Sequence, residues 1–362
     1  NLIKMGDRPE ETAENIKKYL QDYKESIQSF YLPIDTNLKF DRIDYNNIKI
    51  IDSKTKPIIL PCIYNNNEVH NIMLKKEDIR KEEIIMKIIK LMDYFLKKEE
   101  NLDLNVTTYN ILPISHQYGY IEFVPNSATL YKIKEDDNFS IQNWLIENNP
   151  NSNITEIRER ISRSCALYCI ITYLLGIGDR HLDNIMITKD GKLFHIDFGY
   201  ILGIDPKPLS PEIRLTAEMI DAMGGVNSKY YADFKNYCGK AYNCLRRHSS
   251  LFYILLLDLL DFSPPLDGHI ITKEKIKYHI VNRFIPGETY SNATKQIKYK
   301  IELNSNTYSE TVIDYFHKKC KSSNSGSLQD STIDHAVETA IDYSKYVKNS
   351  VVKGFKNLWK KF

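Results

Sequence analysis

Glycine is missing from most of the first third of this 362-residue chain, because none occurs between Gly6 and Gly119. Neither a GxGxxG loop nor a Walker A loop is present anywhere along the sequence. Both loops need glycine where backbone N–H groups approach phosphates closely. Their absence argues against a Rossmann dehydrogenase and against a P-loop NTPase.

Cysteine is sparse as well, and its six copies show no metal-binding spacing. Cys165 and Cys169 lie one helical turn apart among apolar residues, and the other four are scattered. Because there is no CxxC pair, nothing indicates zinc, and we expect buried thiols in a reducing, cytoplasmic compartment.

Long apolar runs and a strong net charge are also absent. The longest apolar run, residues 251–260 (LFYILLLDLL), contains Asp258 and has about half of the ~20 residues that a membrane span needs, so it predicts a core helix. With 49 basic and 47 acidic residues the net charge is +2, which gives no indication of nucleic acid as a partner. Residue 1 is asparagine, which indicates a chain cut from a longer one.

The length and a hydrophobic share of 42% predict one large lobe or two closely packed lobes. Residues 1–30 have helical spacing. In residues 31–125, short β-branched runs broken by turn residues predict antiparallel strands, and residues 77–100 within them predict one amphipathic helix. Residues 126–320 become mainly helical. The predicted fold class is α+β, with a small sheet-containing N-terminal lobe and a larger helical C-terminal lobe.

Residues 321–362 form a separate tail. A polar connector at residues 322–331 precedes a segment with one basic face and one apolar face. The apolar face carries Val351, Phe355, Leu358, Trp359 and Phe362. Such a basic amphipathic helix predicts either contact with a membrane surface or packing against a protein.

Four polar side chains gather in residues 176–200, GIGDRHLDNIMITKDGKLFHIDFGY. Asp179 stands five residues before Asn184, which is the spacing of the base and the metal-binding Asn in the kinase loop HRDxxxxN, although the order here is DRH. A hairpin, IMITKDGKLFHI, then leads to the DFG that Asp197 begins. Asn184 and Asp197 are predicted to bind Mg²⁺, with Mn²⁺ as an alternative, because this ion takes oxygen ligands and is completed by phosphate and water.

These motifs, together with the surrounding SCALYCIITYLLGIGDRHLDNIMIT and KLFHIDFGYILGIDPKPLSPEIRLTAEMIDAMGG, resemble the phosphatidylinositol kinase superfamily, and most closely its class III, vacuolar-sorting type of 3-kinase. The resemblance extends over residues 30–320 and is most specific between residues 160 and 225. It implies a two-lobed protein-kinase-like fold that transfers the γ-phosphate of ATP to the 3-hydroxyl of phosphatidylinositol.

The resemblance implies a set of phosphate-binding residues. Ser53 and Pro57 match a hairpin that covers the phosphates, although both residue types also favour an ordinary surface turn. The family motif KxGDDLRQD is replaced by KKEDIRKEE, so Lys75 is the predicted phosphate lysine if one residue is deleted. Without a deletion Leu74 takes that position, and Lys75 or Lys76 would have to substitute. Glu82 replaces the last Asp of the motif and is expected to anchor that lysine.

The adenine site is predicted in GYIEFVPNSATL, which resembles the hinge between the lobes. The resemblance assigns adenine contacts to the main chains of Glu122 and Val124. It assigns apolar walls to Ile51, Ile121 and Ile196, for each of which core packing is the ordinary alternative.

The residue that accepts the substrate proton is left open. Spacing favours Asp179, whereas the mechanisms of the family favour His181 with Asp179 as its partner, and a neutral histidine is a competent base near pH 7. We interpret Arg180 as a structural, ion-pairing residue and His195 as one that orients the DFG.

The segment after the DFG has few basic residues. Lys207 and Arg214 are the predicted substrate contacts there, and so little positive charge suits an inositol ring without phosphates. The implied partners are phosphatidylinositol in membranes and regulatory protein subunits, with a peripheral location at endomembranes. The alternatives are a phosphatidylinositol 4-kinase, an atypical protein kinase and a weakly active kinase-fold scaffold.

Overall fold

The computed structural model describes residues 14–15, 18, 29–32, 34–51, 55–64, 67–134, 140–151, 153–206, 210–261 and 270–305. The chain separates into two compact units, Asn1–Pro206 with Glu212–Asn306 and Lys207–Pro211 with Thr307–Phe362. Ser210 and Pro211 are the described residues of the second unit, so all elements named below belong to the first. The predicted helix in residues 321–362 lies outside the described residues, as does most of the predicted segment 1–30.

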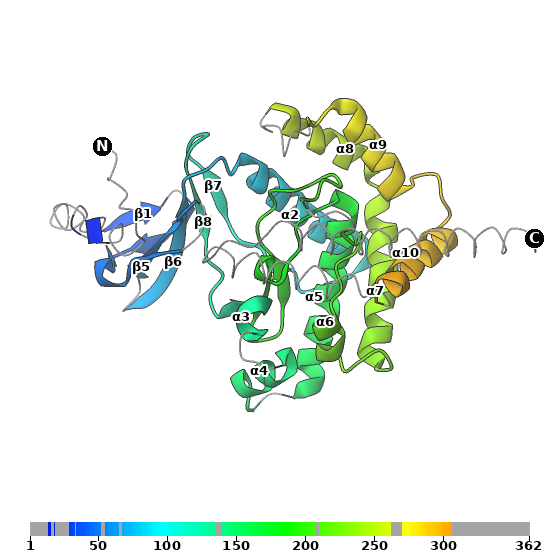
Figure 1. The fold of residues 1–362 in the computed structure, drawn as a ribbon, viewed down its shortest axis with the longest axis horizontal. Helices are drawn as coiled ribbons and strands as arrows, with labels where there is room; N and C mark the ends of the chain where they lie inside the picture. Colours follow the sequence, from blue (N-terminus) through cyan, green and yellow to red (C-terminus); the bar gives the residue numbers. More distant parts are fainter. Residues whose placement is uncertain are drawn as a thin grey trace, which may run out of the picture. The chain divides into compact units, whose positions relative to one another are not determined.

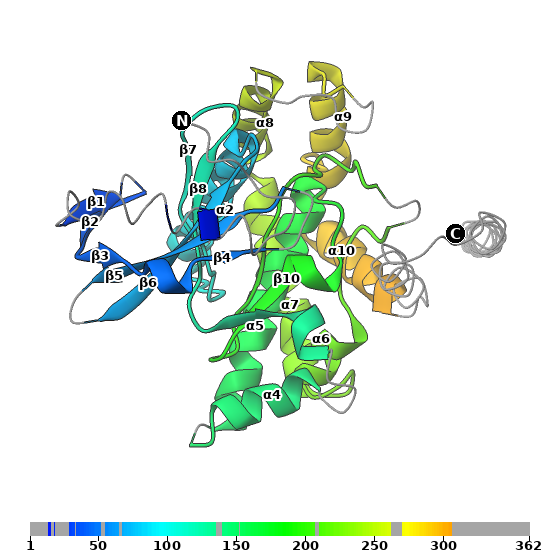
Figure 2. The ribbon, with the colours of Figure 1, turned by 60° about the vertical axis from the view of Figure 1, so that its left-hand side comes forward.

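An antiparallel sheet forms the N-terminal part of the first unit. Its strands are β3 (Arg42–Ile43), β4 (Lys49–Ile50), β5 (Ile58–Tyr64), β6 (Glu68–Lys75), β7 (Ile111–Pro113) and β8 (Gly119–Glu122). They lie in the order β3-β5-β6-β8-β7, and β4 pairs with β5. A hairpin of β1 (Phe30–Leu32) and β2 (Asp35–Phe40) precedes them (Figure 2). The short helix η2 (Tyr45–Asn47) follows β3 and precedes β4 in the sequence. A small core of Phe40, Cys62 and Ile72 holds this part together.

Helix α2 (Arg80–Glu100) packs beside β7 (Figure 1). Its buried side chains include Ile85, Ile89 and Met92, which recur at helical spacing, and Lys97 and Lys98 lie in its last turn. The helix ends at Asn101, which adopts a left-handed conformation with φ of 48°. The amphipathic helix predicted for residues 77–100 is confirmed.

The C-terminal part is mainly helical. Its α-helices are α3 (Leu130–Lys134), α4 (Ile141–Asn148), α5 (Ile154–Leu175), α6 (Ala217–Ala222), α7 (Lys229–Arg246), α8 (Ser249–Leu257), α9 (Lys273–Phe284) and α10 (Tyr290–Ser305). The short helices are η3 (Leu182–Asn184) and η4 (Asp258–Asp261). A small antiparallel sheet joins β9 (Ser127–Thr129), β10 (Ile185–Thr188) and β11 (Leu193–His195) in the order β11-β10-β9. The predicted hairpin of residues 185–196 is thus present, with Ile185 opposite His195.

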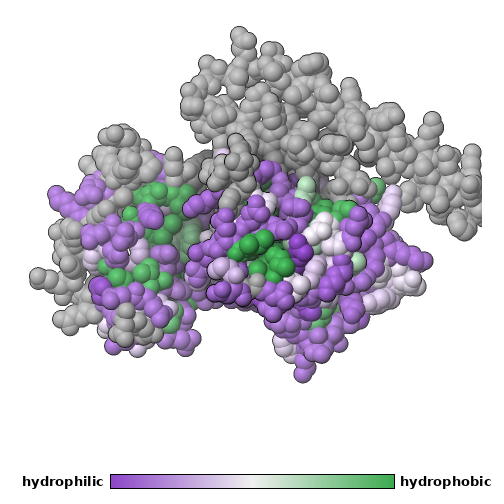
Figure 3. Space-filling model, turned by 90° about the horizontal axis from the view of Figure 1, so that it is seen from below, coloured by the Kyte–Doolittle hydropathy of each residue, from purple (hydrophilic) through white to green (hydrophobic). Residues whose placement is uncertain are grey.

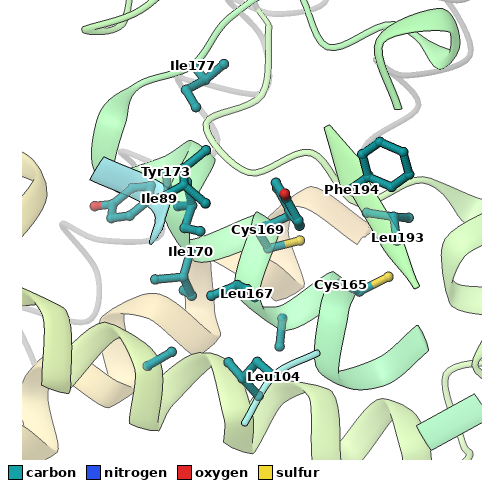
Figure 4. Packing of buried hydrophobic residues seen from close by; sticks show 14 of the residues in the cluster. Ile89, Leu104, Cys165, Leu167, Cys169, Ile170, Tyr173, Ile177, Leu193 and Phe194 are labelled. Atoms are coloured by element: carbon teal, nitrogen blue, oxygen red, sulfur yellow. The ribbon is translucent and has the colours of Figure 1, made fainter. Parts of the chain in front are cut away.

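Helix α5 is the centre of the main core. It is apolar around most of its circumference, which is the pattern of a helix covered on all sides, and it packs against α7 and β11. Figure 4 shows Cys165, Cys169 and Ile170 of this helix among other buried apolar residues, including Phe194 of β11. The core therefore fixes the two segments that follow α5, the loop at residues 176–184 and the strand that leads to Asp197.

The mixture of helix and antiparallel sheet confirms the predicted α+β fold class. Residues 251–260 lie in α8 and η4, with Phe252 and Leu256 fully buried, as expected of a core helix. Among the described residues, no helix has the length and apolar character to cross a membrane. Figure 3 shows one face of the molecule on which hydrophilic residues surround smaller apolar patches.

Candidate active site

Two glycines bring the loop after α5 close to the segment at residues 202–205. Gly176 ends the helix with φ of 60°, and a Cβ there would lie 2.4 Å from the backbone N of Gly203. A Cβ on Gly178 would lie 2.4 Å from the carbonyl O of Ile204. Side chains at these positions would force the backbones apart. The backbone N of Asp179, which follows directly, donates to the Asp205 carboxylate at 2.9 Å.

Arg180 joins this loop to the DFG segment. Its guanidinium is buried and donates only to main-chain carbonyls in the bonds described: Nε to Gly178 O at 2.7 Å, Nη1 to Ile196 O at 2.8 Å and to Asn184 O at 3.4 Å, and Nη2 to Asp197 O. The planar fork of arginine suits several convergent acceptors. Arg180 therefore fixes the backbone of both predicted metal ligands. Its role is structural, but its described bonds go to main-chain carbonyls and not to the ion-pair partner that the sequence predicted.

Asn184 and Asp197 lie on two adjacent segments. The Asn184 Nδ2 donates to Asp179 O at 3.0 Å, and Ile196 N donates to Asn184 O at 3.1 Å. Asp197 has φ of 60° and accepts from Gly199 N at 3.1 Å, and its side chain is exposed to solvent. Asp179 also has a positive φ, of 53°. Left-handed backbone at non-glycine residues is strained and concentrates at functional sites.

Charges near Asp197 favour its ionised form. Partial loss of hydration would raise the pKa of Asp197, but the positive charges of Lys75 and Arg180 outweigh this effect, and the pKa lies below its ordinary value. The carboxylate is therefore available to a divalent cation at neutral pH. Lys75 stands at the end of β6, in the other part of the fold, and its charge acts on the DFG carboxylate.

Lys75 is held by two carboxylates. Its Nζ lies 3.0 Å from Glu82 Oε1 and 3.0 Å from Glu77 Oε1. Burial alone would lower the pKa of Lys75, but the neighbouring carboxylates, that of Glu82 first, hold the pKa above its ordinary value. The contact between Lys75 and Glu82 that the sequence predicted is present, and it joins the end of β6 to the first turn of α2.

His181 lies between two acidic side chains. Its Nε2 is 3.7 Å from Asp179 Oδ2, and its Nδ1 is 3.8 Å from Asp183 Oδ2. Asp179 is thus placed as the predicted partner of His181. The structure favours neither of them as the proton acceptor.

His195 is a buried, structural residue in this fold. Its ring stacks on Tyr168 with centroids 5.1 Å apart, and its carbonyl accepts from the Tyr109 hydroxyl at 3.5 Å. Burial, with help from the charges of Arg180 and Arg214, holds the pKa of His195 well below its ordinary value. The imidazole is therefore neutral at physiological pH.

The predicted adenine-binding strand adjoins β6. Phe123 N donates to Asn71 O at 3.0 Å, whereas Glu122 N donates to Asn110 O at 2.9 Å, away from β6. Strand β8 ends at Glu122, so Val124 lies two residues beyond it. Ile121 is buried, and Val124 and Ile196 are partly buried against the main core.

The remaining predicted residues divide into three cases. Ser53 and Lys207 lie outside the described residues. Ile51 is exposed at 36%. Arg214 is 3% exposed, and its charge acts on His195 inside the fold. Because the Arg214 side chain is buried, it does not reach the surface where a lipid headgroup would bind, and this burial favours a structural role for Arg214.

Sequence reasoning missed Glu77, Asp205 and the full set of carbonyl contacts made by Arg180. Only Glu77 left a signal, as an acidic residue two positions after Lys75. Among the described residues, no cluster of three or more His, Cys, Asp or Glu side chains could hold a metal ion. A magnesium site of one Asp and one Asn needs no such cluster, because nucleotide phosphates and water supply its other ligands.

The N-terminal part has a small antiparallel sheet, and a lysine–glutamate ion pair connects this sheet to helix α2. The helical C-terminal part presents the loop of Asp179 and Asn184 beside the DFG. These features together define a protein-kinase-like phosphotransferase fold. The family model for phosphatidylinositol 3- and 4-kinases matches residues 68–262. The chain belongs to this family.

Curated relatives support the assignment. The chain is 37% identical over 316 residues to phosphatidylinositol 3-kinase pik3 of Schizosaccharomyces pombe, which covers 84% of this chain and 39% of the relative. It is 36% identical over 307 residues to phosphatidylinositol 3-kinase VPS34 of Saccharomyces cerevisiae, or 80% of this chain and 33% of the relative. It is 42% identical over 216 residues to the root isoform of phosphatidylinositol 3-kinase of Glycine max, or 57% and 26%. The chain thus spans between a quarter and two fifths of the length of these relatives.

Proposed function

We propose that this chain is the catalytic domain of a lipid kinase that transfers the γ-phosphate of ATP to the 3-hydroxyl of phosphatidylinositol. The observation that carries the proposal is the ion pair between Lys75 and Glu82, together with the influence of the Lys75 charge on the DFG carboxylate of Asp197. The names of the relatives, all phosphatidylinositol 3-kinases, support the lipid and the ring position.

In the proposed site, Asp197 and Asn184 hold the magnesium ion, and Lys75 binds the phosphates. The ion would neutralise charge on the triphosphate and orient it for transfer. Glu82 and Glu77 keep the ammonium of Lys75 in place and charged. Arg180 keeps the two metal-binding segments in register, so little reorganisation is needed when nucleotide binds.

The proposed reaction is an in-line displacement. The oxygen of the inositol 3-hydroxyl forms a bond to the γ-phosphorus, and the bond between that phosphorus and the β–γ bridging oxygen breaks, which releases ADP. The hydroxyl proton passes to His181 or to Asp179, which lie 3.7 Å apart at the loop. Both candidate acceptors stand on the same loop as Asn184, which would help to hold the metal ion, and Asn184 Nδ2 donates to the Asp179 carbonyl.

The substrate follows from the shortage of positive charge after the DFG. Arg214 is buried, so in the described part of that segment it adds no surface charge for a ring phosphate. An inositol ring without phosphates, in phosphatidylinositol, suits this site. Peripheral contact with endomembranes and binding of regulatory subunits stay predictions of the same proposal.

A lipid kinase assay on phosphatidylinositol vesicles with Mg²⁺ and ATP tests the proposal. We expect phosphatidylinositol 3-phosphate as the product, identified by chromatography against the 3- and 4-phosphate standards, and no product with Asp197→Ala. A 4-phosphate would contradict the ring position. Phosphorylation of peptide in place of lipid, or turnover that Asp197→Ala leaves unchanged, would contradict the proposal itself.

A further inference from the structure

Lys81 is a buried lysine beside the proposed nucleotide site. It stands in the first turn of α2, directly before Glu82, and only 9% of it is exposed. Ile85 and Ile88 follow it at spacings of four and seven residues and are almost fully buried, so Lys81 lies on the inner face of the helix. Lys87, on the outer face, has a side chain that is 70% exposed.

The carboxylates around Lys81 are already engaged by other cations. Glu82 and Glu77 contact Lys75, and Asp78 contacts Arg80. In the described part of the chain, no carboxylate lies within ion-pair distance of Lys81. Glu82 and Asp197 nevertheless act on its charge through space, as do Glu77 and Asp78.

A largely buried lysine that makes no ion pair costs stability. Burial outweighs the attraction of the surrounding carboxylates and lowers the pKa of Lys81. Lys75 has the opposite balance because two carboxylates contact it. An anion that enters between α2 and Asp197 would supply the missing partner.

We propose that Lys81 is a second phosphate-binding ammonium of this site, which contacts the terminal phosphates of a bound nucleoside triphosphate together with Lys75. The proposal rests on the proposed function for the identity of the nucleotide. Lys81 is buried in the first turn of α2 next to Glu82, the partner of Lys75, and this position on the side of the proposed phosphate lysine favours the terminal phosphates. The triphosphate should therefore gain more from Lys81 than the diphosphate does.

The test compares Lys81→Gln, Lys81→Met and Lys81→Arg with the wild-type chain, and Lys87→Gln serves as the matched control on the same helix. Dissociation constants of Mg·ATP and Mg·ADP are measured by displacement of a fluorescent nucleotide. We expect the Gln and Met variants to lose about tenfold in ATP affinity and less in ADP affinity, as for one lost hydrogen bond to a charged group. Lys81→Arg should retain most of the affinity, and Lys87→Gln should match the wild type.

The melting temperature of the nucleotide-free protein gives a second readout. Because Lys81 is buried without a direct partner, Lys81→Met should raise this temperature while it reduces the further rise on adding ATP. A merely structural lysine would move both values downward. Equal ATP affinity in Lys81→Gln and wild type, or a melting temperature lowered in the nucleotide-free Met variant, would overturn the proposal.

The outcome is separable from that of the proposed function. A wild-type chain that binds ATP through Lys81 and phosphorylates no lipid would contradict the lipid kinase and leave the second ammonium standing. A wild-type chain that makes phosphatidylinositol 3-phosphate, with ATP affinity unchanged in Lys81→Gln, would contradict only the role of Lys81.

Discussion

At the scale of single residues, the site depends on how charges are distributed among a few side chains. Lys75 has two carboxylates at 3.0 Å, and Arg180 has backbone carbonyls only among its described hydrogen bonds. A bound phosphate must therefore partly replace the carboxylates that contact Lys75. Arg180 instead holds the backbone of the loop and of the DFG segment in position. The two cations occupy one site and do different work because their partners differ.

Glu82→Gln tests the positioning of Lys75. The amide keeps the size of the side chain and removes its charge, so Lys75 retains only Glu77 as an anionic contact. We expect kcat for lipid phosphorylation to fall by about a hundredfold, the cost of a misplaced catalytic group, with a smaller rise in KM for ATP. Steady-state kinetics on phosphatidylinositol vesicles measures both.

The neighbouring Glu83→Gln is the control, because Glu83 pairs with the exposed Lys87 on the outer face of α2. Loss of an exposed i,i+4 pair should leave kcat within about twofold of the wild type. Equal kinetics in Glu82→Gln and Glu83→Gln would show that the buried pair does not position Lys75.

At the scale of elements, helix α5 positions the loop that carries the site residues. Its C-terminal glycine, Gly176, turns the chain into the loop of residues 177–184, and the backbone of residues 202–203 passes directly over it. His279 of α9 lies at the same helix end, with Nε2 2.8 Å from Leu174 O. The end of α5 is thus enclosed by two other segments, which leaves the loop little freedom.

Gly176→Ala should be strongly destabilising. The Cβ of an alanine there would lie 2.4 Å from Gly203 N, and the alanine would have to adopt a φ of 60°. We expect a loss of about 2–3 kcal/mol in the free energy of unfolding, because a strained conformation and a backbone shift combine. Urea denaturation measures this loss. Gly287→Ala is the control, since a Cβ at Gly287 meets no atom within 4 Å, and equal stability of the two variants would contradict the close packing.

His279 makes the end of α5 sensitive to pH. Burial lowers the pKa of His279 to about 4, below its ordinary value of 6.5, so the unfolded chain binds the proton first as pH falls. The contribution of His279 is therefore fully present above pH 6.5 and is lost between that value and about 4. From pH 7.5 to pH 5 we expect the wild type to lose about 2 kcal/mol more than His279→Gln. Denaturation at the two pH values gives the difference, and identical losses would exclude a buried neutral imidazole at this position.

At the scale of the whole molecule, the sequence predicted the order of strands and helices because hydrophobic periodicity and turn residues are local signals. The helix of residues 77–100 and the hairpin before Asp197 are examples. The spacing of Asp179, Asn184 and Asp197 in the sequence also predicted that these residues belong to one site. Arg180 donates to four carbonyls around these residues, and Asp179 N donates to the Asp205 carboxylate. These contacts depend on the packing of distant segments and leave no pattern in the sequence.

The burial of Arg214 shows the same limit. A basic residue after a DFG suggests a surface charge for a headgroup, and only the packed fold reveals that this one lies inside. Charge alone does not distinguish a ligand contact from a structural cation. Their environments in three dimensions do.

The most direct test of the site is to measure the binding of Mn²⁺ in the presence of ATP. Electron paramagnetic resonance reports the concentration of free Mn²⁺ and therefore the amount bound. The wild-type chain should bind one Mn²⁺ with each nucleotide, and Asp197→Ala and Asn184→Ala should each weaken that binding by more than about tenfold, as expected on removal of a metal ligand. Asp190→Ala, in the turn between β10 and β11, should bind the ion as the wild type does. Unchanged Mn²⁺ affinity in both the Asp197 and Asn184 variants would contradict the assignment of these two residues as the metal site of a kinase.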